Sequence, residues 1–400
     1  MKTQSYLHYY ENELKSVPFM PNVKFLGEKK FPSGISLYDY LNLIIEKNPI
    51  LTKYLNLEKK SPNEWRAIYE ELNIVSTLGD GGFGHGSIGQ IYGRMQRDMR
   101  YCYSRLTGYQ AIFNLMMPLA NAKSGNLIVD LLAGNGTLTR MFKKLHDKIS
   151  PMIIGIDISE TLIKDSFENG EISFRSKMTD NIFGKEIAEA AICAYGTHHI
   201  PEKDRYSFFL SAKELVKKGG KILIHDFEEN SSTAKWYSDL IHRYRPGGHP
   251  CKHFTEAGMK DILSSLFKKT ELTYIYDPFY LEFDREIDNQ QVKRNFFSYL
   301  IRLFALQKLL PKKDVDYFSL GSYKNEKYWN FIETELTPFF NITDSLLSKC
   351  SNKDNLVQYN EGTCIVEKNV IPGTSLRIHE LNGKKFLIAP RVGLVGIGYC

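Results

Sequence analysis

The feature that most constrains this chain is the stretch from Asn126 to Ser166. It opens with a short apolar run, 127–129, which is typical of a strand buried on both faces, and Asp130 closes that run. The turn Ala-Gly-Asn-Gly follows at 133–136. Glycine adopts backbone angles that other residues resist, and it lets a ligand approach the main chain closely. The pattern predicts a strand that leads into a ligand-binding turn.

The same stretch continues into a second strand. Residues 137–145 have helical periodicity, and 153–156 then form another apolar run that ends in Asp157. A carboxylate at the tip of this strand suits a ribose diol, because it can accept hydrogen bonds from both hydroxyls. We therefore expect a strand–turn–helix–strand unit that binds a ribose-containing cofactor.

These residues resemble motif I and the acidic position after it in class I S-adenosylmethionine (SAM)-dependent methyltransferases. The usual family pattern is Asp-x-Gly-x-Gly-x-Gly, and Leu132 stands here where the first glycine usually sits. The resemblance covers roughly residues 120–280. It implies an α/β, Rossmann-like, doubly wound sheet, mostly parallel with a reversed last hairpin, and SAM as the cofactor.

The resemblance also implies which residues contact SAM. Asp130 would hold the methionine end, Asp157 the ribose, and Lys177 and Met178 the adenine, while Tyr195 would lie along the cofactor. The expected cofactor contacts are Asp130, Ala133, Gly134, Gly136, Asp157, Ile158, Lys177, Met178 and Tyr195.

A nicotinamide dinucleotide is the main rival cofactor, and a purely structural turn is a further alternative. The third spaced glycine of G-x-G-x-x-G is missing, because Leu138 and Thr139 follow Gly136. An acid also precedes the glycines, where it would repel a pyrophosphate but attract the ammonium of a methionine. Both features favour SAM.

Composition limits the class of protein. Hydrophobic content of 42% and charged content of 24% are ordinary for a soluble globular protein. A net charge of +6 is mild for 400 residues and does not indicate a nucleic-acid binder. The six cysteines form no C-x-x-C pair, which fits a reducing compartment rather than a disulfide framework or zinc ribbon. Without an apolar signal region or a run long enough to span a bilayer, we expect a cytoplasmic protein with no membrane partner.

The aromatic content of 13% is unusual, and much of it lies outside the expected SAM core. A bulky organic substrate pocket would require such residues. Large helical packing surfaces explain it equally well.

Residues 1–120 are predicted to form a helical cap or lid region. Residues 36–46 carry apolar positions at helical spacing, and Ser61-Pro62 with Glu64 is typical of a helix start. This region would cap the core or form a homodimer contact. The glycine-dense segment 76–93 fits a mobile lid or hinge, with an ordinary loop as the alternative.

The segment 94–122 is amphipathic and dense in arginine and tyrosine. In similar small-molecule methyltransferases the helices just before motif I contact the substrate, and an arginine can hold a carboxylate with two hydrogen bonds. The alternative is a solvated arginine face. The candidate contacts are Tyr92, Arg97, Arg100, Tyr101, Arg105 and Tyr109.

Histidines follow the fourth and fifth predicted strands. The run 190–195 reads as strand four and precedes Gly-Thr-His198-His199, which resembles a turn common in the family. A helix, Gly219-Gly220 and the strand 221–224 lead to His225-Asp226. The carboxyl ends of parallel strands bind ligands in open α/β sheets, and histidine is the natural general base near neutral pH. A structural role for the paired histidines is the alternative.

Residues 228–256 are expected to form a substrate-side insertion with a local cluster of His242, His249, Cys251 and His253. Substrate contact or proton transfer is the preferred role for these residues, and the alternative is that the histidines only cap neighbouring helices. A metal site of His225, His249 and His253 is conceivable, since three imidazoles suit iron or zinc, but no metal is expected. The candidate catalytic residues are His225, His249 and His199, and the candidate substrate contacts are Tyr92, Arg97, Tyr101, His198 and His253.

The sequence predicts a SAM-binding domain over 121–284 and an α+β C-terminal extension over 285–400. Residues 272–276 and 279–283 would form the reversed hairpin. Apolar helices are expected near 295–306 and 328–340, followed by a small β appendage over 356–399. Asn382-Gly383 is a strong hairpin turn inside that appendage.

The function that fits these features is a SAM-dependent methyltransferase of specialised metabolite biosynthesis, acting on an oxygen, nitrogen or carbon of a small molecule. Nucleic-acid methyltransferases usually carry Asn/Asp-Pro-Pro-Tyr after strand four, where this chain has Tyr-Gly-Thr-His. Aminocarboxypropyl transfer, SAM cyclisation and a non-catalytic partner protein are the alternatives.

Overall fold

The fold is described from a computed structural model of the protein. The structure describes residues 3–25, 30–32, 34–78, 95, 103–116, 125–145, 151–311, 319–353, 356–360, 363–367, 372–381 and 383–400. The expected lid over 76–93 lies almost wholly outside these residues. So do four predicted substrate contacts, namely Tyr92, Arg97, Arg100 and Tyr101.

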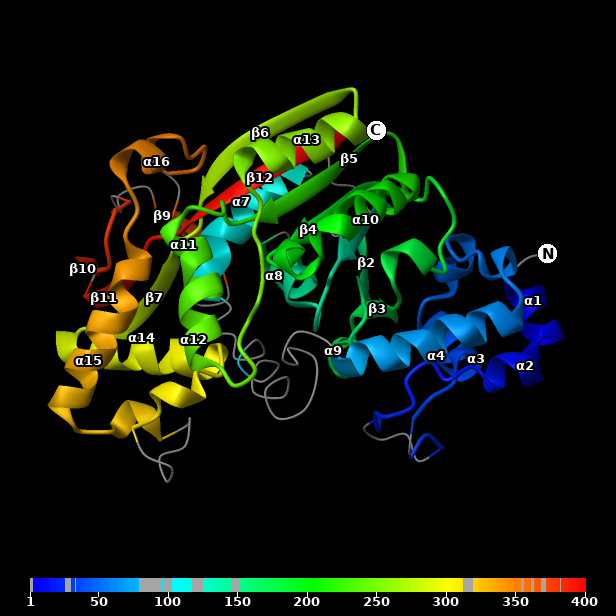
Figure 1. Cartoon of the computed structure of the whole chain (residues 1–400), viewed down its shortest axis with the longest axis horizontal. Coiled ribbons are helices and arrows are strands. Elements are labelled where there is room, and N and C mark those ends of the chain that lie inside the picture. Colours follow the sequence, from blue (N-terminus) through cyan, green and yellow to red (C-terminus); the bar gives the residue numbers. More distant parts are fainter. Residues whose placement is uncertain are drawn as a thin grey trace.

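A mostly parallel sheet forms the centre of the molecule (Figure 1). Among the described residues it has seven strands, in the order β3-β2-β1-β4-β5-β12-β6. Strands β1 to β5 pair in parallel, and β12 is antiparallel to both of its neighbours. The predicted Rossmann-like, mostly parallel fold is therefore confirmed, and β12 is the one reversed strand of this sheet among the described residues. The strands are β1 (Leu127–Leu131), β2 (Met152–Asp157), β3 (Ile172–Arg175), β4 (Ala188–Ala194), β5 (Val216–Asp226), β6 (Lys269–Tyr276) and β12 (Val392–Tyr399).

The reversed strand does not come from the predicted hairpin. Strand β6 pairs with β12, which comes from the range 285–400 that we expected to be a separate extension. Strand β7 (Phe279–Asp284) leaves the central sheet and pairs with β11 (Lys384–Ala389), which pairs with β10 (Arg377–Leu381). The prediction that 272–276 and 279–283 pair with each other is therefore wrong.

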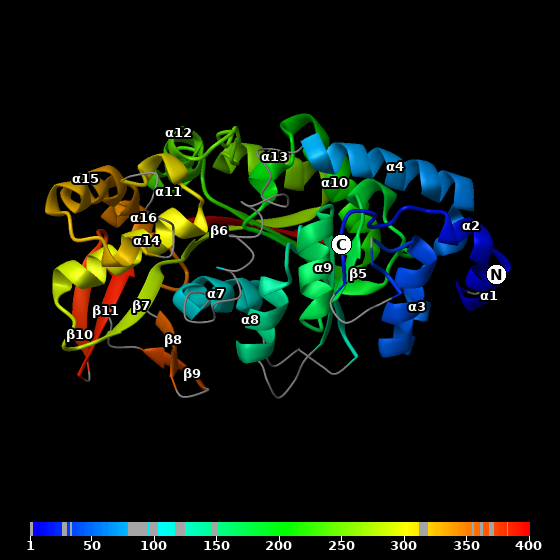
Figure 2. The ribbon, with the colours of Figure 1, turned by 90° about the horizontal axis from the view of Figure 1, so that it is seen from below.

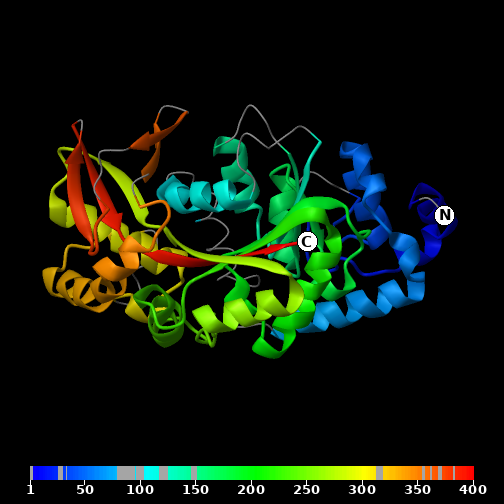
Figure 3. The same ribbon diagram turned by 90° about the horizontal axis from the view of Figure 1, so that it is seen from above.

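The sequences of β12 and β7 give a physical reason why β12, and not β7, pairs with β6. Strand β12 reads Val-Gly-Leu-Val-Gly-Ile-Gly-Tyr and is buried along nearly its whole length, as suits a strand covered on both faces. Strand β7 ends in Glu-Phe-Asp, and both acids are exposed. Figure 3 shows the β7–β11–β10 sheet at the end of the molecule opposite the N-terminal helices.

Helices cover both faces of the central sheet, as Figure 2 shows. On one face, α7 (Leu106–Met116) and α8 (Thr137–Leu145) pack Ile112, Phe113 and Phe142 against Ile128 and Leu223 of the strands. The other face is covered by α10 (Glu202–Leu215) and α13 (Glu256–Leu266). Helix α9 (Glu160–Glu168) follows β2.

The N-terminal helices cover the edge of the sheet at β3 (Figure 1). The Tyr40 hydroxyl donates to the carbonyl of Ser173, and the Tyr69 hydroxyl donates to that of Arg175 at 3.0 Å. The buried Arg175 side chain pairs with Glu160 at 3.2 Å. The edge strand is therefore shielded from pairing with another chain. These helices are α1 (Thr3–Tyr9), α2 (Glu11–Lys15), α3 (Leu37–Lys47) and α4 (Pro62–Leu78).

The predicted helix over 36–46 and the predicted helix start at Ser61-Pro62 are confirmed. The Ser36 hydroxyl accepts from the backbone of Asp39 and caps α3. Ser61 and Glu64 bond reciprocally, since Ser61 N donates to Glu64 Oε2 at 2.8 Å and Glu64 N donates to Ser61 Oγ at 3.4 Å. This reciprocal pair is a capping box at the start of α4.

The insertion after β5 packs against the C-terminal helices. Trp236 and Tyr237 of a π-helical turn join a second core with Phe296 and Phe340. Leu381 and Lys384 pair, as the hairpin predicted at Asn382-Gly383 requires, although Asn382 itself lies outside the described residues. No helix in the described part of the chain is long and apolar enough to cross a membrane. The remaining elements are α11 (Ser232–Lys235), the π-helical turn (Trp236–Ile241), α12 (His242–Tyr244), α14 (Asn289–Leu303), α15 (Glu326–Leu336), α16 (Asp344–Ser348), β8 (Leu356–Asn360) and β9 (Thr363–Glu367).

Candidate functional site

Polar residues gather where the parallel strands end. Asp130 lies on β1, Asp157 ends β2, His198 follows β4 in a short 3-10 turn, and Asp226 ends β5. Because the carboxyl ends of parallel strands meet at one edge, these side chains share the edge where open α/β sheets bind ligands.

The turn after β1 is tied to the tip of β2. Asp157 accepts hydrogen bonds from the backbone N–H of Gly134 and of Ser159, each at 2.9 Å. Gly134 has φ +54°, and a Cβ built there would meet only Leu162 Cδ1, at 3.8 Å. Gly136 differs, because its Cβ would lie 2.7 Å from Ser166 Oγ. Gly134 thus faces open space that can admit a ligand, and Gly136 serves close packing against α9.

Leu132 retains the backbone conformation that a glycine would have at its position. Its φ is +59°, in the left-handed region, which costs a non-glycine residue about 1–2 kcal/mol. Tyr195, just after β4, has φ +61°. Strained residues of this kind concentrate at functional sites.

Asp130 is a buried carboxylate poised for a cationic ligand. It is 2% exposed, and its Oδ2 has no hydrogen-bond partner among the described residues. Burial raises its pKa well above the usual range, and the nearby Asp157 adds to the effect. Burying such a group without a partner is unfavourable, so an ammonium group placed beside it would be stabilised. The Asp130–Gly134–Asp157 arrangement therefore fits the methionine and ribose ends of SAM.

The other predicted cofactor residues lie around this turn. Ala133 is buried beneath Gly155, and Ile158 is 37% exposed beside Asp157. The Lys177 ammonium pairs with Glu71, and Met178 is buried in the main core. Their contacts with SAM stay predictions.

Asp226 organises two of the histidines. His253 Nδ1 lies 2.8 Å from Asp226 Oδ1, and His198 Nδ1 lies 3.1 Å from Oδ2. The backbone N–H groups of His198 and Phe227 also donate to Asp226, each at 2.8 Å, and the Thr197 hydroxyl bonds to it as well. Both imidazoles thus turn Nδ1 towards the carboxylate and Nε2 away from it.

The charges in this group are set by burial and pairing. Burial alone would raise the pKa of Asp226, but His198 and His253 outweigh it and hold that pKa well below its usual range. Burial lowers the pKa of His198 to about 4, against the opposing effect of Asp226. His198 is therefore a neutral imidazole at physiological pH.

Further groups meet this pair. The rings of His198 and His199 lie 4.3 Å apart, and those of His199 and His249 lie 5.1 Å apart. Cys251 Sγ lies 3.2 Å from His249 Nδ1. The structure therefore brings together four predicted histidines, namely His198, His199, His249 and His253. The sequence indicated each of them, but not that His198 and His253 converge on Asp226.

His225 lies apart from this cluster. Adjacent strand residues point to opposite faces, so His225 faces α7 while Asp226 faces the other way. Its ring is fully buried 4.3 Å from that of Tyr195, and neither ring nitrogen has a hydrogen-bond partner in the described part of the chain. Burial lowers its pKa to about 3. The structure does not bring His225 together with His249 and His253, so those three form no common metal site. A catalytic role for His225 stays a prediction.

Two residues at this edge were missed by sequence reasoning. Arg391, which precedes β12, pairs with Asp277 after β6 at 2.7 Å, and both are buried. Burial raises the pKa of Asp277 to about 6, although Arg391 and Arg105 oppose the shift. A Cβ on Gly108 would lie 2.0 Å from Asp277 Oδ1, so this glycine permits the contact between α7 and the sheet. Arg391 was missed because its segment was expected to form a separate appendage.

Two predicted substrate contacts, Arg105 and Tyr109, lie in the described residues. Both are buried, and the Arg105 guanidinium lies 5.5 Å from the Tyr109 ring centre and 5.4 Å from that of Tyr195. The alternative interpretation, in which Arg105 belongs to a solvated arginine face, is therefore wrong for this residue.

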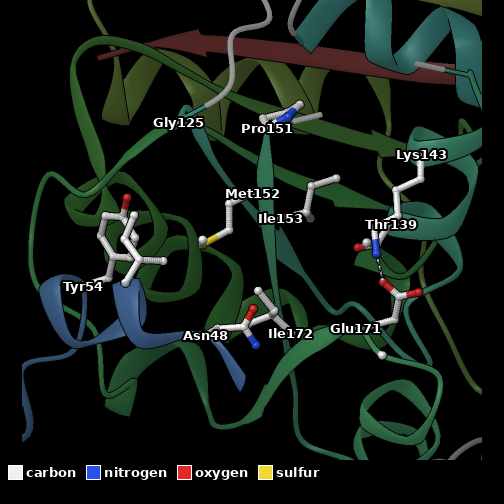
Figure 4. Close-up of a pocket in the computed structure, with 12 residues that line it drawn as sticks. Asn48, Tyr54, Gly125, Thr139, Lys143, Pro151, Met152, Ile153, Glu171 and Ile172 are labelled. Carbon is white, nitrogen blue, oxygen red and sulfur yellow. Dashed lines mark hydrogen bonds and ion pairs between the residues drawn. The ribbon is translucent and has the colours of Figure 1, made fainter. Parts of the chain in front are cut away.

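A cavity of about 460 Å³ opens at the other edge of the sheet (Figure 4). Its lining includes Gly125, Met152 and Ile172 at the amino ends of β1, β2 and β3. Lys143 and Glu171, which both line it, pair with each other at 3.2 Å on one side of it. It therefore lies away from Asp130 and Asp157, and it includes none of the predicted site residues.

Comparisons with known proteins address the same region. Residues 129–224 match the family model described as "Methyltransferase domain". The ubiquinone/menaquinone biosynthesis C-methyltransferase UbiE of Pseudomonas aeruginosa strain LESB58 is 26% identical over 122 residues, which are 28% of this chain and 46% of that protein. The corresponding protein of Pseudomonas paraeruginosa is also 26% identical, over 123 residues. The chain thus spans about half the length of the curated relatives it matches.

Similar solved structures include the YcgJ protein of Bacillus subtilis, with 14% identity, a TM-score of 0.37, and coverage of 73% of this chain and 99% of that one. A phosphoethanolamine N-methyltransferase of Haemonchus contortus has 12% identity and a TM-score of 0.39, with coverage of 73% and 52%. The sheet order, the Asp130–Gly134–Asp157 arrangement and the family match over 129–224 agree. This chain therefore contains a class I SAM-dependent methyltransferase domain.

Proposed function

We propose that this protein transfers a methyl group from SAM to a small organic molecule. The observation that carries the proposal is the arrangement of Asp130, Gly134 and Asp157 inside the matched methyltransferase domain. Asp130 is a buried carboxylate that a cation would stabilise. Asp157 is a second carboxylate, and it lies beside the backbone of Gly134, which a ligand can approach.

The chain's own residues would orient the donor. SAM, when bound, supplies a methyl group already activated on a sulfonium. Asp130 would hold the ammonium of the methionine end, and Asp157 would accept from the ribose hydroxyls. Proximity and orientation can lower the barrier of such a displacement by up to about 7–11 kcal/mol in ideal cases. The main task of the protein is therefore positioning and exclusion of water.

The acceptor would lie at the ends of β4 and β5. The predicted catalytic residues His199 and His249 lie there, together with His198 and His253. Imidazoles at this place can accept a hydrogen bond or a proton from an oxygen, nitrogen or activated carbon. The absence of the Asn/Asp-Pro-Pro-Tyr motif and the mild net charge support a small acceptor rather than a nucleic acid.

Biosynthesis of a specialised metabolite is the context we propose. The curated relatives are named for C-methylation in ubiquinone and menaquinone biosynthesis, which supports a biosynthetic acceptor. The match covers under a third of this chain, so the acceptor of those proteins is not carried over.

The test is to identify the product formed from SAM. The purified protein is incubated with SAM and a panel of small aromatic and keto-acid acceptors, and nucleoside products are separated by chromatography. Methyl transfer predicts S-adenosylhomocysteine that depends on the acceptor. Methylthioadenosine would instead indicate aminocarboxypropyl transfer or cyclisation, and would overturn the proposal.

A further inference from the structure

The histidine cluster has the composition of a metal site. Among the described residues, one ligand atom from each of His198, His199 and His249 lies within 4.8 Å of the other two. We propose that these three imidazoles bind a single divalent transition-metal ion, of the zinc or iron(II) class. Imidazole nitrogen is the preferred protein ligand of such ions.

Asp226 prepares His198 for this role. Asp226 Oδ2 lies 3.1 Å from His198 Nδ1 and occupies that nitrogen, so Nε2 is the atom that would bind the metal. A carboxylate behind a metal-binding histidine fixes the ring orientation and raises its basicity. The backbone N–H of His198 is held by the same carboxylate at 2.8 Å.

His249 is held by its own loop. Its Nδ1 lies 3.2 Å from Cys251 Sγ, so Nε2 is the ring nitrogen that would bind the metal. Its backbone N–H donates to His242 Nδ1 at 3.0 Å. Gly248 before it has φ +69°, and a Cβ there would lie 2.9 Å from the His242 ring. The loop therefore fixes where the His249 ring enters the cluster.

His199 completes the set from the solvent side. Zinc–nitrogen bonds of about 2.0–2.1 Å place neighbouring ligand nitrogens about 3–3.5 Å apart. Nitrogens that lie up to 4.8 Å apart would therefore have to approach one another on binding. His198 and His249 are buried, whereas His199 is exposed and can turn to make this adjustment. Three ligands with one open side are typical of catalytic rather than structural sites.

A second grouping, His198, Asp226 and His253, is a poorer site. Asp226 already accepts from both rings, from two backbone N–H groups and from the Thr197 hydroxyl. A carboxylate offers about four lone-pair positions, so a metal ion here would have to displace these bonds. The structure therefore favours Asp226 as a residue that orients His198 by hydrogen bonding, and not as a metal ligand itself.

The site would face the methyl acceptor at the ends of β4 and β5. A metal there would bind an acceptor oxygen or nitrogen and lower its pKa. This role rests on the proposed function, whereas metal binding itself does not.

The test is titration of untagged, chelator-treated protein with Co²⁺ followed by displacement with Zn²⁺. Visible absorption of Co²⁺ reports nitrogen ligation, and elemental analysis reports stoichiometry. We expect one ion per chain. His199→Ala and His249→Ala should each weaken binding at least tenfold, while His379→Ala, on the distant β10, should leave it unchanged.

The proposal is overturned if no ion binds at a 1:1 ratio, or if the His199 and His249 variants bind as tightly as the natural protein. His199 is exposed, so its variant keeps the test valid if His249→Ala fails to fold. SAM titration of the same samples separates the two proposals. Normal SAM binding without metal binding would overturn the metal site alone.

Discussion

Leu132 and Asp157 are the residues through which single side chains shape the cofactor turn. Leu132 has φ +59° where related proteins usually have glycine, and Asp157 holds the backbone of Gly134. The first residue holds a backbone conformation that is strained for a side chain other than glycine. The second is a side chain that supports the turn and would contact the ribose.

The strain at Leu132 can be measured by comparing two substitutions. We expect Leu132→Gly to be more stable than Leu132→Ala by about 1 kcal/mol, because only glycine adopts a left-handed φ without strain. At an ordinary position the order is reversed, since glycine is about 0.5–1 kcal/mol less stable than alanine in regular structure. Chemical denaturation of both variants gives the comparison. Equal stabilities would show that the backbone relaxes elsewhere.

Asp157→Ala should weaken SAM binding at least tenfold, because the ribose loses its acceptor and Gly134 N–H loses its partner. Calorimetric titration with SAM measures the effect. Asp261→Ala, an exposed acid on α13, is the matched control and should bind SAM normally. Unchanged affinity in Asp157→Ala would contradict the ribose assignment.

Residue types indicated much of the candidate site, but not how its members combine. Asp130, Asp157 and the histidines after β4 stand at strand ends, which local pattern can locate. His225 and Asp226 are neighbours in sequence, yet strand alternation sends them to opposite faces. The convergence of His198 and His253 on Asp226 depends on a loop 27 residues away, whose path no local pattern specifies.

At the scale of elements, β12 fits between β5 and β6 through its small residues. A Cβ on Gly398 would lie 2.3 Å from the Phe267 ring, and one on Gly396 would lie 2.6 Å from Leu263 Cδ1. These glycines let α13 and the residue after it approach the sheet. On the other face, Gly393 makes room for the His225 ring, because a Cβ there would lie 2.3 Å from His225 Nε2.

Gly398→Ala should therefore destabilise the protein by about 1–3 kcal/mol, as expected for an added methyl group in a packed core. Gly184→Ala is the matched control, because its Cβ would meet ordinary contacts at 3.6 and 3.7 Å. That control should be neutral or slightly stabilising. Thermal and denaturant unfolding of both variants test this. A tolerated Gly398→Ala would mean that α13 can move away from β12.

The parallel strands could be predicted because each is a short apolar run between helix signals. The partner of β6 could not, because several apolar runs near the end of the chain have suitable sequences. Strand β7 follows β6 after two residues, so a local hairpin was the simplest expectation. The actual partner starts more than a hundred residues later, and long-range pairing leaves no local signal.

At the scale of the whole molecule, the buried Asp277–Arg391 pair joins the ends of β6 and β12. It lies at the same edge as the predicted acceptor site. Gly108 packs against both Asp277 and the Tyr195 hydroxyl, so the pair is a neighbour of Tyr195. Its ionisation therefore couples global stability to pH.

The pKa of Asp277 is raised by burial to about 6 in the folded chain, against an ordinary value of 3.8. The folded state binds this proton more tightly than the unfolded state, so its stabilising effect is complete below about pH 4 and is lost as pH rises through about 6. Asp277→Asn cannot ionise. The free energy of unfolding of the variant minus that of the natural protein should therefore rise between these pH values, by up to about 3 kcal/mol.

Denaturant unfolding of both proteins from pH 4 to 7 measures this difference. Losing the charge partner of Arg391 would shift the whole curve of the variant, so the slope with pH is the quantity that decides. Parallel curves would contradict the raised pKa of Asp277.

Asp130, Gly134 and Asp157 are proposed to bind SAM at the carboxyl ends of β1 and β2. The most direct measurement is calorimetric titration of the purified full chain with SAM and, separately, with NADH. We expect one SAM site in the micromolar range and no heat of binding with NADH. NADH binding without a response to SAM would contradict this proposal.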